Sequence, residues 1–110
     1  MRNYSNIYTK DQAYRAIIQL RPMNDKVYDY VLDLIEKRND CFINKEEKLK
    51  TGIDIYINNN SFAVAIGKKL KDKFKGTLKL SRKLHSRDRV ASKPLYRVTV
   101  CFRLNQDNNK

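Results

Sequence analysis

The fold is decided by residues 51 to 74, which read TGIDIYINNNSFAVAIGKKLKDKF. At the start of this stretch, Ile53, Ile55 and Ile57 alternate with Asp54 and Tyr56. Successive side chains of a strand point to opposite faces of a sheet. The alternation therefore predicts a strand with one apolar, buried face and one polar face.

The second part of the same stretch changes to a helical period. The run Asn58-Asn59-Asn60-Ser61 offers several side chains that can cap a helix N-terminus. The apolar stripe that follows consists of Phe62, Ala63, Ile66, Leu70 and Phe74. Gly76 suits a left-handed position after the helix end. The spacing predicts a second helix, and on its opposite side Lys68, Lys71 and Lys75 point outward together.

Elements of the same two kinds are predicted before this stretch. Residues 14 to 21 alternate as a strand, with Tyr14 and Leu20 on its core side, and Pro22 ends it. Asn24 caps a first helix, whose apolar stripe is formed by Val27, Val31, Leu34 and Ile35. Residues 41 to 44 predict a short strand, and residues 45 to 50 predict a charged turn.

Two further strands are predicted after it. Leu78 and Leu80 are expected to face the core in the first, and residues 96 to 104 alternate cleanly in the second. Between them, residues 84 to 94 predict a long basic hairpin loop.

These elements define an α+β domain in the order β-α-β-β-α-β-β. Two amphipathic helices and one alternating sheet give a two-layer α/β sandwich, with both helices on one face of a mainly antiparallel sheet. We expect residues 1 to 12 to form a flexible N-terminal tail, residues 13 to 104 a single domain, and residues 105 to 110 a polar C-terminal tail.

The positive charge of the chain is concentrated in one segment. The whole chain has 24 basic and 12 acidic residues, a net charge of +12. Residues 68 to 103 hold thirteen of the basic and two of the acidic side chains, a balance of +11. Charge gathered in this way repels itself in the folded state, so it indicates a polyanionic partner.

The polar face of the predicted sheet is unusual because it is almost wholly cationic and polar. It is expected to carry Arg15, Gln19, Arg21, Tyr56, Lys79, Ser81, Arg97, Thr99 and Arg103. The segment from Lys79 to Lys93 supplies arginine forks and lysine point charges, which are the side chains that bind phosphates. The candidate nucleic-acid contacts are Arg15, Arg21, Lys68, Lys71, Lys75, Lys79, Ser81, Arg82, Lys83, His85, Arg87, Arg89, Lys93, Arg97 and Arg103.

Catalytic and metal chemistry find little support in the sequence. His85 is the only histidine, and Asp88 is the only nearby carboxylate that could orient it. Cys41 and Cys101 have no CxxC spacing and are expected to be free thiols. We therefore expect no enzyme activity, no metal site, no cofactor and no small-molecule substrate. The longest apolar runs are short and the N-terminus is polar, so we expect neither a membrane partner nor a secretory signal, and a cytoplasmic location.

Several short motifs, in their order and spacing, resemble a known family. They are YRAIIQLR at 14 to 21, KTGIDIYI at 50 to 57, Phe62-Ala63, LSRKL at 80 to 84 leading into RDR at 87 to 89, and YRVTV at 96 to 100 before Phe102-Arg103. Over residues 14 to 104 the chain resembles the middle domain of the archaeal counterparts of the eukaryotic large-subunit nuclear export adaptor. That family is often described as nonsense-mediated-decay proteins affecting ribosome stability.

The resemblance implies the fold of a eukaryotic-type large-subunit ribosomal protein and binding to the large ribosomal subunit. It marks Ser81, Lys83, Arg87, Arg89 and Arg97 as expected ribosome contacts, and it implies no catalytic residue.

The leading hypothesis is thus an rRNA-binding protein of the large subunit, either a resident ribosomal protein or a maturation or stability factor. Its expected partners are ribosomal RNA and large-subunit ribosomal proteins. The alternative is an interaction module whose basic face docks an acidic assembly or translation factor.

Overall fold

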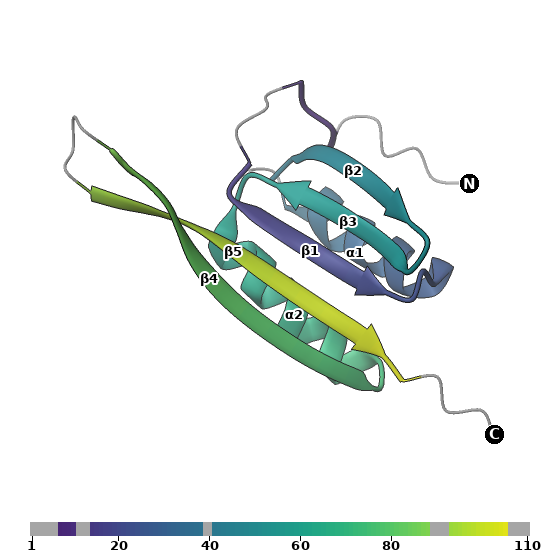
Figure 1. The fold of residues 1–110 in the computed structure, drawn as a ribbon. Helices are drawn as coiled ribbons and strands as arrows, with labels where there is room; N and C mark the ends of the chain where they lie inside the picture. Colours follow the sequence, from purple (N-terminus) through teal and green to yellow (C-terminus); the bar gives the residue numbers. More distant parts are fainter. Residues whose placement is uncertain (1–6, 11–13, 39–40, 89–92, 106–110) are drawn as a thin grey trace.

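A computed structural model describes residues 7–10, 14–38, 41–88 and 93–105, and within 84–95 it describes the backbone alone. Its elements, labelled in Figure 1, are β1 (Ala16–Arg21), α1 (Asp25–Lys37), β2 (Ile43–Leu49), β3 (Gly52–Ile57), α2 (Asn60–Lys73), β4 (Gly76–Asp88) and β5 (Lys93–Leu104). The order β-α-β-β-α-β-β confirms the sequence-based prediction.

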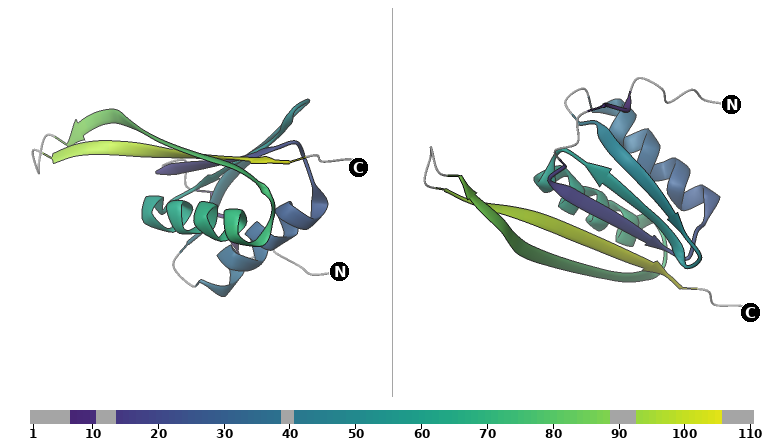
Figure 2. Two further views of the ribbon diagram at one scale, coloured as in Figure 1. Left: turned by 90° about the horizontal axis from the view of Figure 1, so that it is seen from below. Right: turned by 45° about the horizontal axis from the view of Figure 1, so that its top comes forward.

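The five strands form one mixed sheet in the spatial order β2-β3-β1-β5-β4. The central pair, β1 and β5, is parallel, and the other three pairs are antiparallel. Both helices cover the same face of this sheet, as the edge-on view in Figure 2 shows, so the predicted two-layer α+β architecture is confirmed. The other face is turned toward the viewer in Figure 1 and is called the open face below, because no helix of the described residues covers it.

The core lies between the helices and the three central strands. Ile53, Ile55 and Ile57 of β3 are fully buried, as their alternation predicted. Ile18 of β1 and Phe102 of β5 are also fully buried. The parallel β1–β5 pair and the antiparallel β1–β3 pair thus bring residues far apart in sequence onto one apolar surface.

Both helices begin where the sequence predicts. The side chain of Asn24 accepts hydrogen bonds from the backbone N–H groups of Lys26 and Val27 at 2.9 and 3.2 Å. In α2, Asn59 accepts from the N–H of Phe62 at 2.9 Å. Each cap satisfies donors that a helix N-terminus leaves without an intrahelical partner.

The strand β2 replaces the charged turn that was predicted over residues 45 to 50. Its charged side chains do not alternate with apolar ones, so the local pattern gave no strand signal. Pairing with β3 supplies the reason for the strand, since Lys45 lies opposite Tyr56 and Glu47 opposite Asp54. Gly52 closes the β2–β3 turn at φ +153°, where a Cβ atom would collide with the carbonyl oxygen of Leu20.

The β4–β5 hairpin is much longer than predicted, and the prediction of a basic loop over residues 84 to 94 is wrong. β4 continues to Asp88 and β5 begins at Lys93, with Arg87 opposite Pro94 near the end. In Figures 1 and 2 this part of the hairpin extends beyond α2. A strand pair without a helix on it needs no apolar alternation, and that alternation was the signal from which the strands were predicted.

The end of α2 also differs from the prediction. The helix ends at Lys73, Phe74 is extended, and Gly76 begins β4 rather than taking a left-handed position. At Gly76 a Cβ atom would come within 2.7 Å of the Phe102 ring, so close approach of the two strands accounts for this glycine. Leu80, expected in the core, is 47% exposed, because β4 is an edge strand of the sheet.

Part of the predicted N-terminal tail packs against the domain. Ile7 is buried, and the N–H of Thr9 donates to the carbonyl of Ile43 at the start of β2. The hydroxyls of Tyr8 and Tyr28 both donate to the carboxylate of Glu46, at distances between 2.8 and 2.9 Å. These bonds join the N-terminal segment, α1 and β2. Residues 1 to 6 and 11 to 13 lie outside the described part of the chain.

This tyrosine cluster predicts a loss of stability at high pH. Burial raises the pKa of Tyr28 above its ordinary value of 10.0, and hydrogen bonds with Tyr8 and Glu46 raise it further. Above pH 10 the unfolded chain releases the phenol proton while the folded chain retains it, so stability falls as the pH rises. We expect the urea midpoint to decrease between about pH 9 and about pH 11, and Tyr28→Phe to reduce that decrease.

The phenolate absorbance of the folded protein provides a direct check. The unfolded chain in denaturant should titrate its tyrosines together near their ordinary pKa, while part of the folded signal should appear at higher pH. Identical titration curves for the two states would contradict the effect of burial on Tyr28.

Candidate nucleic-acid interface

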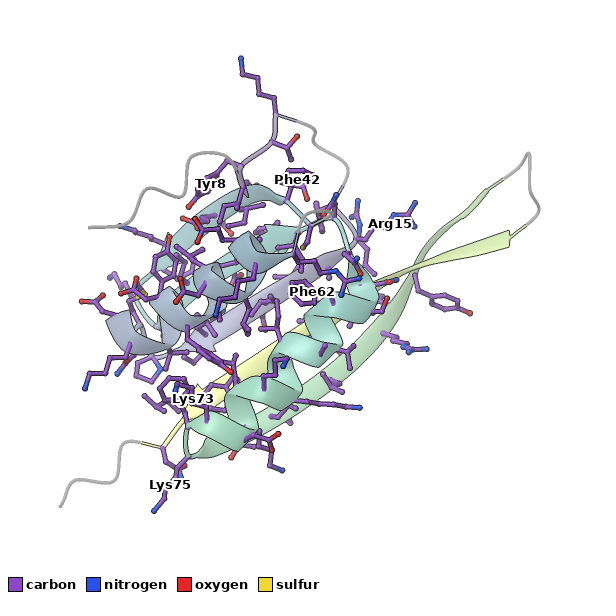
Figure 3. The ribbon with its side chains drawn as sticks, turned by 180° about the vertical axis from the view of Figure 1, so that it is seen from behind. Tyr8, Arg15, Phe42, Phe62, Lys73 and Lys75 are labelled. Atoms are coloured by element: carbon purple, nitrogen blue, oxygen red, sulfur yellow. The ribbon has the colours of Figure 1, made fainter. Side chains whose placement is uncertain are left out.

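Exposed cations gather toward one edge of the molecule, on β4, at the end of the neighbouring β5 and on the helix behind them. We call seven of them the basic surface: Lys68, Lys71, Lys75, Lys79, Arg82, Lys83 and Arg103. All seven were predicted as contacts, and all are exposed. Lys75 is labelled in Figure 3, at the point where α2 gives way to β4.

The strand β4 distributes its charges to both faces of the sheet. Leu78 lies opposite the buried Phe102 and packs on the helix side. Alternation then places Lys79, Ser81 and Lys83 on the open face and Arg82 on the helix side. The basic surface therefore wraps around the β4 edge and is not confined to one sheet face.

Like charges lie directly opposite each other on the open face. Lys83 of β4 is paired with Arg97 of β5 in the antiparallel register. Such a pair destabilises a sheet, whereas an opposite-charge pair stabilises it. A bound phosphate placed between the two cations would relieve this repulsion.

Arg97 is held in place by an aromatic side chain. Its guanidinium carbon lies 3.9 Å from the centroid of the Tyr14 ring, and Nη1 donates to the Tyr14 hydroxyl at 3.0 Å. Tyr14 was predicted to face the core, but it lies on the open face. Its backbone precedes β1, and its ring packs edge-on against Tyr56 at 4.7 Å.

The stack continues across the sheet to β2. The ammonium group of Lys45 lies 4.5 Å from the centroid of the Tyr56 ring. Burial raises the pKa of Tyr56, and the negative charges of Glu47 and Asp54 raise it further, so this phenol stays neutral well above physiological pH. Arg97, Tyr14, Tyr56 and Lys45 thus form a continuous cation–aromatic row from β5 to β2.

Arg21 has a different environment from the other candidate contacts. Its Nη2 forms an ion pair with Asp54 Oδ1 at 2.6 Å, and its Nη1 donates to the carbonyls of Leu20 and Ile53 at 3.1 Å. The two charged side chains are only 13% and 10% exposed. Arg21 thus lies on the predicted face, but its charge is already compensated within the domain.

The remaining predicted contacts are only partly described. Arg15 is exposed just before β1 and is labelled in Figure 3. His85 and Arg87 belong to β4 and Lys93 to β5, but their side chains lie outside the described ones, and Arg89 lies outside the described residues altogether.

Two exposed cations of α2 were missed by the sequence reasoning. Lys69 and Lys73 line a shallow depression together with Asp72 and Tyr30, and the Lys73 ammonium lies 5.2 Å from the centroid of the Tyr30 ring. On the helical wheel, Lys69 and Lys73 lie on the side of α2 that is turned toward Tyr30 of α1, next to the side that carries Lys68 and Lys71.

The acidic side chains of α1 lie away from this edge. Asp25 and Asp29 are exposed on α1, which sits behind the half of the sheet that contains β2 and β3 (Figures 1 and 2).

A search of the described residues finds no cluster of three or more histidine, cysteine, aspartate or glutamate side chains suited to hold a metal ion. Within the same residues, no helix is long and apolar enough to cross a membrane. Cys41 is buried and Cys101 is half-buried on the open face, and the two cysteines are not joined by a disulfide.

Fold and charge together define a small α+β domain with a basic edge. The family model described as the second domain of NMD3 matches residues 13–104, and the chain belongs to this family. The family is associated with the large ribosomal subunit, as the resemblance in the sequence implied. A search of curated proteins finds no match to the chain.

Proposed function

We propose that this chain is an rRNA-binding protein of the large ribosomal subunit, acting as a resident component or as a maturation or stability factor. The observation that carries the proposal is the basic surface, seven exposed cations on α2, on β4, between these two elements and at the end of β5. Family membership supports the ribosome as the source of the polyanion. The proposed role is binding, with no catalytic step, in the cytoplasm where ribosomes work.

The geometry of the basic surface suits a nucleic-acid backbone. Lys79, Ser81 and Lys83 project from alternate positions of one strand, so the two lysines are about 13 Å apart. A row of cations with this spacing can contact phosphates that are not immediate neighbours on one nucleic-acid strand, with Ser81 between them. Arg97, fixed on Tyr14, adds a guanidinium whose orientation is set before RNA arrives.

The proposal predicts a steep salt dependence. In a titration with a large-subunit rRNA fragment, log K should fall linearly with log salt concentration, by about 0.7 to 0.9 per phosphate neutralised. If five or more cations of the basic surface engage phosphates, the slope should be about −4 or steeper. A slope near zero would rule out the electrostatic interface.

One observation favours the alternative, an acidic protein partner. β4 pairs only with β5, so its other edge is available within the described sheet, and it carries Lys79, Arg82 and Lys83. An acidic extended segment could pair with that edge. Copurification with and without RNase separates the two functions, since a partner that survives RNase, with no crosslink to rRNA, would favour the protein.

A further inference from the structure

A pocket opens where the β4–β5 hairpin passes the first turn of α2. Its volume is about 160 Å³, and it is lined by Asn60, Ser61, Val64, Arg82, Tyr96 and Val98. Phe62, labelled in Figure 3, marks this turn of the helix. The pocket lies on the helix side of the sheet, whereas Lys79, Lys83 and Arg97 lie on the open face.

The pocket presents an aromatic side chain that the fold does not use. Tyr96 is 47% exposed, although the next inward residues of β5, Val98 and Val100, are buried. The reason is positional, since Tyr96 lies opposite Leu84 in the part of the hairpin where α2 begins. Its ring is therefore available to stack on a planar ligand.

The other residues that line the pocket supply the remaining groups needed to bind a nucleobase. Val64 and Val98 provide an apolar floor, while Asn60 and Ser61 carry side chains that can donate and accept hydrogen bonds. Arg82 lies opposite Val98, diagonal to Tyr96, and brings a cation to the rim. A cavity of about 150 Å³ accommodates a benzene ring, so this pocket, which is open to solvent, has room for one ring of a planar base.

We propose that this pocket binds the base of one unpaired ribonucleotide. The base stacks on Tyr96 and its hydrogen-bonding edge faces Asn60 and Ser61, while Arg82 meets the adjoining phosphate. The inference rests on the proposed RNA binding and adds a substrate class to it, namely RNA with an extruded nucleotide beside the segment that the basic surface holds. Bases outside a duplex are commonly recognised by aromatic stacking and hydrogen bonds of this kind.

The test compares two RNA duplexes of equal length, one fully paired and one with a single bulged 2-aminopurine. The native chain should bind the bulged RNA at least about five-fold more tightly, and the fluorescence of the bulged base should decrease on binding. Tyr96→Ala should lose both effects, whereas Tyr96→Phe, which keeps the ring, should retain them. Arg82→Ala should weaken binding of both RNAs and reduce the preference.

Leu80→Ala is the matched control. Leu80 has the same 47% exposure as Tyr96 and lies on β4, but it does not line the pocket. This variant should keep the preference and the fluorescence change, and circular dichroism should show that all variants remain folded.

The outcomes separate this inference from the proposed function. If both RNAs bind equally and the fluorescence is unchanged, the pocket does not take a base, although RNA binding itself stands. If Tyr96→Ala keeps the preference for the bulged RNA, the proposal that the pocket binds the base is also wrong. If neither RNA binds in a salt-dependent manner, the proposed function fails, and this inference fails with it.

Discussion

Replacing Lys79, Lys83 and Arg103 together by alanine should weaken rRNA binding roughly 100-fold at physiological salt. All three are exposed and lie on the open face of β4 and β5, so their removal leaves the core intact. Affinity varies with salt concentration to a power of about −0.8 per phosphate contact, so each contact contributes roughly five-fold at about 0.15 M salt relative to 1 M. Fluorescence anisotropy with a labelled large-subunit rRNA fragment measures the loss.

The salt slope should change with the affinity. Three lost contacts should reduce its magnitude by about 2 to 3, because each neutralised phosphate accounts for about 0.7 to 0.9. A large loss of affinity with an unchanged slope would mean that the three side chains do not contact phosphates.

A second triple variant controls for net charge. Lys26, Lys48 and Lys50 are exposed on α1, on β2 and in the β2–β3 turn, away from β4. Their replacement by alanine removes the same charge, but we expect it to weaken binding by less than about three-fold. Equal losses for the two triple variants would contradict a localised interface and favour diffuse attraction by the net charge.

The parts of the fold that the sequence predicts are those in which local pattern and tertiary environment agree. The alternation of Ile53, Ile55 and Ile57 reflects burial of one strand face against the helices. Asn24 and Asn59 act through hydrogen bonds to residues two or three positions away, so the caps can be recognised without any knowledge of the fold.

The predictions that were wrong concern elements that form by pairing with another segment of the chain. Residues 45 to 49 become a strand because β3 lies beside them, and nothing in their own sequence requires it. The end of the β4–β5 hairpin also depends on pairing, since residues 84 to 88 pair with residues 93 to 96 where α2 does not cover the strands. A sheet without a buried face leaves little periodicity in the sequence from which to predict it.

The candidate site also has features that the sequence predicts and features that it does not. Exposure of Lys68, Lys79 and Lys83 follows from helical and strand periods, which the sequence displays. The stacking of Arg97 on Tyr14 and the ion pair of Arg21 with Asp54 depend on which strands are neighbours. Only the register places Gln19 opposite Asp54 and thereby brings Arg21, two residues further along the same face of β1, within reach of that carboxylate.

The Arg21–Asp54 pair leads to the largest expected effect on stability. Asp54→Ala should reduce the free energy of unfolding by about 3 to 5 kcal/mol, because it leaves a largely buried guanidinium without its counter-ion. That is a large part of the roughly 5 to 15 kcal/mol that a domain of this kind has in total. Urea unfolding followed by circular dichroism measures the change.

Two further variants test the physical cause. Asp54→Asn keeps an acceptor for Arg21 at nearly the same volume, so it should be less damaging than Asp54→Ala. Replacing both partners by apolar residues, as Arg21→Met with Asp54→Leu, should recover much of the lost stability, because no buried charge remains. A loss below about 1 kcal/mol for Asp54→Ala would show that solvent compensates the guanidinium after all.

The double variant also decides what Arg21 does for RNA. If its charge is neutralised by Asp54, then Arg21→Met with Asp54→Leu should bind the rRNA fragment with nearly native affinity and an unchanged salt slope. A slope reduced by about 0.7 to 0.9 would instead show that Arg21 leaves the ion pair to contact a phosphate. Stability and RNA affinity measured on the same variant therefore distinguish a structural arginine from a binding one.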